Sequence, residues 1–263
     1  RVIAYRPNIV FTYYPYIESF TRSAYIETDL EAKRVLLERA VEVGREGLEH
    51  AEGSCCPFQA RSVFSALSIA LYWLSDMETN VSNKRRLLEE AWEQREKAID
   101  IEQSVTPFDY WFRGDSQNYR ALIEAELAKI ETNKQKKRKL LEKAVSSMEN
   151  CLKFGAKDLE ERPQPWKFGS LARFQYWFGG ILNQLYLLTE DKKVLERAIE
   201  VYNGAVEMYG KLEQPSRMAE SHWEIAKIYD SLGDHPKAAL NYESAAEKYR
   251  FATEKIPQLK EFY

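Results

Sequence analysis

Residues 137–144 read KRKLLEKA, and versions of this phrase stand at three other places in the chain. It reads KRVLLERA at 33–40, KRRLLEEA at 84–91 and, more loosely, DKKVLERA at 191–198. The alanines that close the four copies are 51, 53 and 54 residues apart. Self-similarity at such a spacing is typical of helical repeat arrays, in which each unit buries its apolar face against its neighbours. The phrase therefore predicts an all-α chain of repeated helical hairpins.

Apolar residues continue past each closing alanine at helical spacing. Met148 and Cys151 follow Ala144, and Tyr202 follows Ala198, at the i, i+4, i+7 positions of a helix that buries one face. We expect the small closing residue to let a partner helix approach closely. The lysine and arginine that lead each phrase are expected on the solvated side.

Prolines punctuate the repeats at a nearly constant offset. They lie 17, 16, 19 and 17 residues beyond the four closing alanines, at Pro57, Pro107, Pro163 and Pro215. Proline does not continue a helix but is well suited to start one. Each proline therefore marks the change from the second helix of one hairpin to the first helix of the next. The pattern predicts long aromatic first helices at 58–75, about 108–130 and 166–188.

The most specific pattern lies in the last repeat. It combines small residues in a first helix, a Gly-Asp turn, and an Ala-x3-Tyr-x2-Ala sequence in a second helix; these residues are Ala219, Ala226, Gly233, Asp234, Ala238, Tyr242 and Ala245. The chain resembles a tetratricopeptide repeat (TPR) array, strongly over 179–250 and in degenerate form over 15–165. Trp223 departs from the pattern by one place. The resemblance implies an α-α superhelix whose first helices line a concave groove for partners.

The closing alanines and prolines divide the chain into about five hairpins. We expect a single TPR-like solenoid over 1–263, with units at 15–56, 57–106, 107–162, 163–214 and 215–256. Residues 257–263 read as the start of a further helix or as a short cap. The missing Met and the absence of polar capping helices favour a piece of a longer protein.

Composition limits the classes of function. Balanced charge, with 38 basic and 41 acidic side chains and a net charge of −3, gives no broad electrostatic footprint for nucleic acid or an anionic membrane. Apolar runs are too short for a membrane span, and the first residues of the sequence do not show the pattern of a signal peptide. Three cysteines form no disulfide framework, so we expect a reducing, cytoplasmic location.

No constellation for catalysis or cofactor binding stands out. The phosphate-binding glycine patterns and the G-x-S-x-G elbow are absent. His50, Cys55 and Cys56 could suggest a metal site, but vicinal cysteines and three ligands do not meet the usual requirement for structural zinc. We therefore expect a non-enzymatic protein without metal or cofactor.

Two features of the predicted first helices bear on binding. Aromatic side chains crowd these helices, either as core or as anchors for a partner, and core packing is the favoured interpretation. Arginines follow the inter-helix prolines, among them Arg61, Arg120 and Arg173. They are interpreted as solvated side chains, although a shared face would suit carboxylates or phosphates.

The predicted function is a protein-interaction or sensor scaffold that binds a helix or peptide of a partner, or another segment of its parent protein. A narrower version places it as the sensor region of a multidomain signalling ATPase, by analogy of fold. The predicted groove residues are Arg61, Arg120, Arg173, Tyr176, Asn183, Glu220, Trp223, Lys227 and Asp230. The alternative is a receptor for a small anionic ligand, which would require an enclosed cavity lined by Arg61, Arg120 and Arg173.

Overall fold

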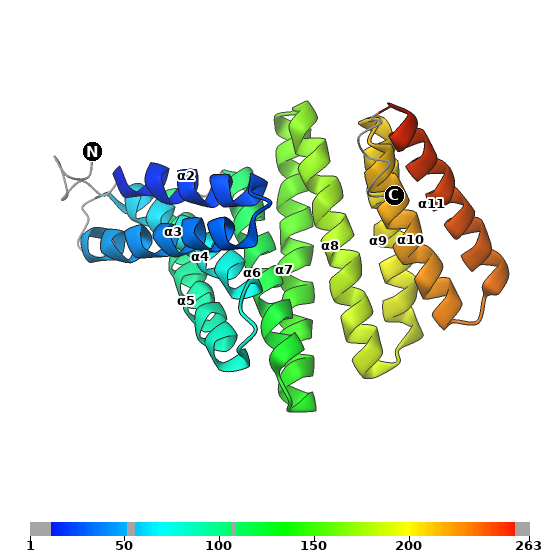
Figure 1. Ribbon diagram of the computed structural model, residues 1–263, viewed down its shortest axis with the longest axis horizontal. Helices are drawn as coiled ribbons and strands as arrows, with labels where there is room; N and C mark the ends of the chain where they lie inside the picture. Colours follow the sequence, from blue (N-terminus) through cyan, green and yellow to red (C-terminus); the bar gives the residue numbers. More distant parts are fainter. Residues whose placement is uncertain (1–11, 52–55, 107–108, 256–263) are drawn as a thin grey trace. The chain divides into compact units, whose positions relative to one another are not determined.

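A computed structural model describes residues 12–51, 56–106 and 109–255 (Figure 1). These residues form α-helices joined by short connections, and no strand occurs among them. The all-α fold class is therefore confirmed. The chain divides into two compact units, Arg1–Ser147 and Met148–Tyr263, and the boundary falls within the long helix α7 (Lys134–Glu161).

Unit 1 is a stack of antiparallel hairpins. The first pairs α2 (Tyr13–Ile26) with α3 (Leu30–Ala51), and the second pairs α4 (Pro57–Asp76) with α5 (Val81–Val105). Helix α6 (Tyr110–Ile130) packs against α5 and precedes α7. The first helices also touch one another, since α4 contacts both α2 and α6. This is the neighbour-to-neighbour packing of a helical repeat.

Unit 2 contains two further hairpins. Helix α8 (Pro165–Thr189) packs against α9 (Lys192–Lys211), and α10 (Pro215–Ser231) packs against α11 (His235–Lys255). The two hairpins are joined by the contact between α9 and α10. The helices predicted at 58–75 and 166–188 are confirmed to within a residue at each end, and the one predicted at about 108–130 ends at Ile130 as expected.

In three hairpins the first and second helices begin with different chemistry, whereas α6 begins with an aspartate cap, Asp109, as the second helices do. Proline occupies the first turn of α4, α8 and α10, where its missing N–H costs nothing. Each second helix begins instead with an Asp or Asn whose side-chain oxygen accepts from a backbone N–H two or three residues later; these caps are Asp29, Asn80, Asn133, Asp191 and Asp234. Every hairpin therefore carries its own signal for where the second helix starts.

The predicted close approach of helices at the phrase alanines is confirmed. Ala40, Ala91, Ala144 and Ala198 are fully buried. Gly44, one turn beyond Ala40, continues the same contact, because a Cβ atom there would lie 2.7 Å from Leu67 Cδ1. Small residues thus set how closely α3 packs on α4.

The expectation that the leading cations are solvated is wrong at the second position of the first two phrases. Arg34 donates to the Met77 carbonyl oxygen at 2.6 Å, just beyond the end of α4. Arg85 donates to the Ile130 carbonyl oxygen at 3.2 Å, at the end of α6. Each guanidinium also pairs with the glutamate that follows that carbonyl. Both arginines therefore close the first helix of the next hairpin, where carbonyls lack helical partners.

Several features of the sequence analysis lie outside the described residues: Cys55 of the metal site that was weighed, the helix start at Pro107 and Phe108, and the further helix at 257–263. A single solenoid over the whole chain stays a prediction. Helices α4, α8 and α10 start at Pro57, Pro165 and Pro215, whereas the sequence pattern had marked Pro163 for the third of these starts; the division into five units stays a prediction.

Candidate functional site

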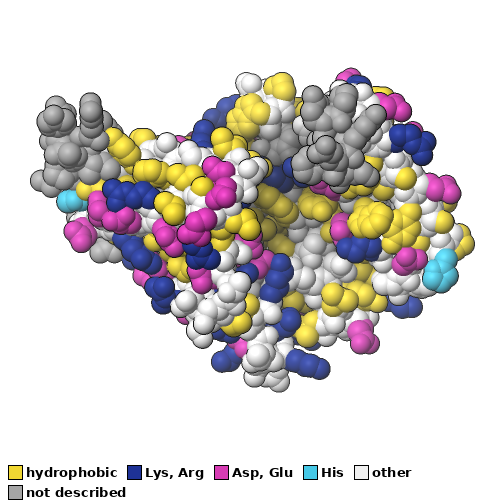
Figure 2. All heavy atoms as spheres, viewed as in Figure 1, with side chains coloured by type: hydrophobic (Ala, Val, Ile, Leu, Met, Phe, Trp, Pro, Cys, Tyr) yellow, Lys and Arg dark blue, Asp and Glu magenta, His cyan; other side chains and the backbone are white. Residues whose placement is uncertain are grey.

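Seven of the nine predicted groove residues lie on the first helices of unit 2. We use the name α8–α10 face for these seven predicted residues taken together, which are Arg173, Tyr176 and Asn183 of α8 and Glu220, Trp223, Lys227 and Asp230 of α10. Figure 2 shows hydrophobic and charged side chains together over these two helices. The face is therefore mixed in character.

The four residues of α10 form one stripe, because their spacing of three, four and three residues follows the helical turn. The other side of α10 is its core side, with Ala219, Ile225, Ala226 and Ile228 buried. Trp223 is 48% exposed, and Lys227 and Asp230 are also exposed. Helix α10 is thus amphipathic, yet it presents a tryptophan on its polar side.

Contacts with α11 hold Trp223 in place. Its ring packs edge-on against Tyr242, with ring centroids 5.0 Å apart. The Tyr242 hydroxyl donates to Asp230 Oδ2 at 3.1 Å, and His235 Nδ1 lies 3.2 Å from the other carboxylate oxygen of Asp230. The predicted groove residue Asp230 therefore orients the aromatic pair from within the hairpin.

On α8, Tyr176 packs edge-on against Tyr202 of α9, with centroids 5.6 Å apart. Gly179 makes room for Tyr202, since a Cβ atom there would lie 2.6 Å from its ring. Arg173 is exposed, and its guanidinium lies 5.0 Å from the centre of the Trp177 ring. Asn183 is half-buried, about two turns beyond Tyr176.

Carboxylates of α10 lie close to these phenols. Burial, together with the charges of Glu224 and Glu220, raises the pKa of Tyr176 to about 12, while Arg217 opposes the shift. Glu220 accepts from Arg217 at 2.8 Å, and Glu224 accepts from Lys227 through both oxygens, at 3.1 and 3.0 Å. The structure therefore brings Tyr176 of α8 within electrostatic reach of α10.

The remaining two predicted residues, Arg61 and Arg120, lie in unit 1. Arg61 is buried and donates through Nε to Glu102 Oε1 at 2.7 Å. Its guanidinium also lies 4.2 Å from the centre of the Phe112 ring. Arg120 pairs with Glu96 at 3.0 Å and with the buried Glu124 at 3.3 Å. Both arginines are thus neutralised by carboxylates of their own unit.

A buried network around Arg95 was not found from the sequence. Arg95 is fully buried and donates to Ser65 Oγ at 2.9 Å and to Ser116 Oγ at 3.2 Å. Ser116 in turn donates to Glu102 Oε1 at 2.7 Å, the atom that also binds Arg61. Burial lowers the pKa of Arg95. The sequence signal was the pair of serines at 65 and 68, which stand three residues apart among apolar residues.

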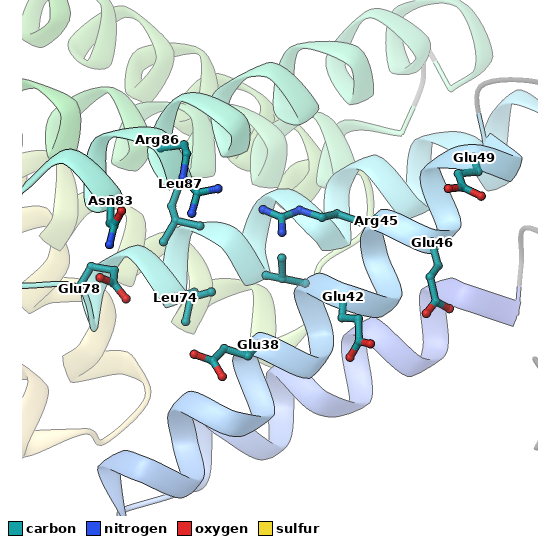
Figure 3. A pocket seen from close by; sticks show the side chains of 11 residues that line it. Glu38, Glu42, Arg45, Glu46, Glu49, Leu74, Glu78, Asn83, Arg86 and Leu87 are labelled. Atoms are coloured by element: carbon teal, nitrogen blue, oxygen red, sulfur yellow. The ribbon is translucent and has the colours of Figure 1, made fainter. Parts of the chain in front are cut away.

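Unit 1 also has an open pocket of about 500 Å³ between α3, α5 and the end of α4 (Figure 3). Four glutamates of α3 line it, together with Glu78, Arg45 and Arg86. Arg45 pairs with Glu90 of α5 at 2.7 Å. None of the arginines predicted for an anionic ligand lines this pocket.

The described residues form no cluster of three or more His, Cys, Asp or Glu side chains that could hold a metal ion. His50 stacks on Tyr13, with ring centroids 5.4 Å apart. Within the same described ranges, no helix combines the length and apolar character that crossing a bilayer demands.

One segment of the chain matches the model of a known protein family. The model of the soluble NSF attachment protein (SNAP) family matches residues 188–260, which is less than half of the chain. The matched segment contains α9, α10 and α11, and therefore Trp223 and its supporting contacts. No curated protein sequence matches the chain.

Solved structures resemble the chain over nearly all of its length. BtubC (BKLC) from P. vanneervenii is 17% identical with a TM-score of 0.55, and the likeness covers 93% of this chain and 91% of that protein. A variant of a putative kinesin light chain with nearly identical TPR-like repeats, from Podosopora anserina, is 16% identical with a TM-score of 0.52, covering 94% and 98%. The TPR-like helical repeat fold is therefore confirmed.

Proposed function

We propose that the protein is a non-catalytic interaction scaffold that binds a helix or extended segment of a partner protein on the α8–α10 face. TPR-like repeats generally mediate contacts between proteins, through the surfaces that their stacked hairpins create. The likeness of residues 188–260 to an attachment protein family supports the same kind of role. Because the family model matches residues in unit 2, unit 2 is the part of the chain in which partner binding should be tested first.

The observation that carries the proposal is the way Trp223 is held. An exposed indole costs solvation unless something covers it, and tryptophan is enriched among the residues that dominate interface energies. Trp223 is fixed by Tyr242, whose hydroxyl is fixed by Asp230. A side chain ordered in advance loses little conformational entropy when a partner arrives.

The alternative receptor for a small anionic ligand has weaker support. It needs Arg61, Arg120 and Arg173 around one ligand, and Arg61 and Arg120 already bind Glu102, Glu96 and Glu124. An anion would have to displace those carboxylates, and removing one partner of a buried ion pair is costly.

A partner-capture experiment with the whole chain tests the proposal. We expect Trp223→Ala to abolish capture of a protein that the wild-type chain retains from its native extract. The melting temperature should fall by no more than about 4 °C, because the substitution removes one aromatic pair on a half-exposed side chain.

Phe251→Ala is the matched control, since Phe251 is 46% exposed on α11, close to the exposure of Trp223. Capture that survives Trp223→Ala would contradict the proposal. A collapse of the melting temperature would instead make Trp223 a core residue. Comparing capture by the intact parent protein with capture by residues 1–263 tests the narrower role as the sensor region of a signalling ATPase.

A further inference from the structure

We propose that residues 1–11 of the chain bind across the pocket of unit 1 and place Arg6 against Glu46 and Glu49 of α3. These residues precede α2 and lie outside the described part of the chain. The binding concerns unit 1 alone, whereas the proposed function concerns unit 2. The pocket thus takes an occupant from its own chain.

The pocket is a groove with an apolar floor and an acidic rim. Val41, Leu74 and Leu87 line it and are buried. The rest of its lining includes five glutamates against two arginines. Four of the glutamates follow one side of α3, at intervals of four, four and three residues. Like charges at this spacing repel one another, so a cation on the rim relieves the repulsion.

Two carboxylates at one end of the groove have no cation of their own. Figure 3 shows Glu46 and Glu49 together near the end of α3, apart from Arg86. Neither glutamate forms an ion pair within the described parts of the chain. Arg45, next to Glu46 in the sequence, is held by Glu90 of α5 through two bonds, at 2.9 and 2.7 Å. We use the name open acidic end for Glu46 and Glu49.

Other glutamates of the rim already have partners. Glu42 pairs with Arg39 of the same helix, and Glu78 pairs with Arg34 at 2.6 Å. A cation that enters the groove would have to compete for those carboxylates. It meets no competitor at the open acidic end, which is therefore where the groove selects positive charge.

The composition of residues 1–11, RVIAYRPNIVF, complements the groove. The segment contains Arg1 and Arg6, no acidic residue, and apolar residues at most of its other positions. A guanidinium group binds carboxylates through paired hydrogen bonds, as Arg45 binds Glu90 in this groove. Apolar side chains beside the arginines gain by covering the apolar floor. Charge and apolar character thus match together.

The start of α2 is fastened beside the end of α3, which brings the segment to the groove. Tyr13 stacks on His50, with ring centroids 5.4 Å apart, and a Cβ atom at Gly47 would lie 3.0 Å from Tyr13 Cβ. A helix with its side chains is about 10–12 Å across. The six residues from Arg6 to Phe11 span up to about 20 Å when extended. Arg6 can therefore pass around α3 and reach the open acidic end.

Zero-length cross-linking of the whole chain tests the contact. Arg6→Lys keeps the positive charge and supplies an amine, which a carbodiimide joins to a carboxylate that it touches. We expect mass spectrometry to find the amine at position 6 joined mainly to Glu46 and Glu49. Added salt should lower the yield, because both glutamates are exposed.

Chymotrypsin cleavage after Tyr5 gives a second measurement, which needs no new amine. Glu46→Gln combined with Glu49→Gln should release the segment and speed this cleavage about two- to ten-fold, because two exposed ion pairs are lost. The matched control combines Glu89→Gln with Glu93→Gln on α5, which are exposed and do not line the pocket. It should leave the rate unchanged. Circular dichroism confirms that each variant keeps its helices.

Cross-links spread evenly over the carboxylates of unit 1 would overturn the inference, as would a cleavage rate that is the same with and without Glu46 and Glu49. Cross-links between two chains that increase with protein concentration would place the segment on a second copy, which also overturns it. Neither result changes capture through Trp223 in unit 2. The proposed function therefore stands or fails separately.

Discussion

Units 1 and 2 are built from the same kind of hairpin, but they place their arginines differently. In unit 1, Arg61 and Arg95 extend into the stack and are linked through Glu102 and Ser116. In unit 2, Arg173 and Arg217 remain exposed on α8 and α10. Unit 2 also has a buried ion pair, Asp158–Lys167 at 2.5 Å, close to the connection between α7 and α8. The helical repeat therefore determines where a helix lies. It does not determine whether the polar side chains of that helix are buried in the core or exposed to solvent.

The strongest way to test this difference is to remove the central carboxylate of unit 1. Glu102→Ala leaves Arg61 buried without its bonded carboxylate and removes the acceptor of Ser116, so we expect a loss of about 3–5 kcal/mol in the free energy of unfolding. Urea unfolding followed by circular dichroism measures it. A loss below about 1 kcal/mol would show that the network contributes as little as a surface pair.

A smaller effect is expected from the close packing in unit 2. Gly179→Ala places a methyl group 2.6 Å from the Tyr202 ring and should cost about 1–3 kcal/mol. Gly180→Ala is the matched control, since the nearest atom is the Tyr202 hydroxyl at 3.7 Å. It should stabilise the helix by about 0.5–1 kcal/mol. Opposite changes in melting temperature for these adjacent glycines would confirm the packing.

The change in stability of unit 1 with pH should be smaller than the effect of Gly179→Ala. Burial raises the pKa of Glu124 and of Glu96, more than Arg120 lowers it. The folded protein therefore binds these protons more tightly than the unfolded chain does, and the contribution of both groups to stability is lost as pH rises through their folded pKa values. Glu124→Gln should reduce the gain in stability between pH 7 and pH 4, measured against wild type by urea unfolding. An unchanged difference across that range would contradict the assignment.

The smallest effect is expected on exposed helix surfaces. Lys211→Ala removes the pair with Glu207 on α9, where both side chains are more than half exposed. The free energy of unfolding should change by less than about 0.5 kcal/mol. A larger change in thermal unfolding would mean that Lys211 has a role besides this pair.

The hairpins were predictable because their signals are local. The repeated phrase and the proline after it locate the helices of each unit, and the buried alanines confirm which side of the second helix faces the core. The caps Asn80 and Asp191 mark the starts of second helices more sharply than the repeated phrase does.

The directions of the arginine side chains were not predictable, because they depend on partners that are distant in the sequence. Arg61 stands four residues after Pro57, which places it in the first turns of α4 but does not say which neighbour it faces. Its partner Glu102 is 41 residues away, on another helix. Such a pair depends on how two helices are rotated against each other. That the seven unit 2 residues bind a partner stays a prediction, because their positions are known and an occupant is not.

Arg34 and Arg85 each tie a hairpin to the end of the helix that opens the following one. The smallest self-contained fragment of unit 1 is therefore longer than one sequence repeat, and it includes the first helix of the repeat after it. A fragment that ends at a proline would leave such an arginine without its acceptor, and a fragment that begins there would expose the carbonyl that the arginine covers. Shortened versions of this chain are better terminated after α4 or α6 than before them.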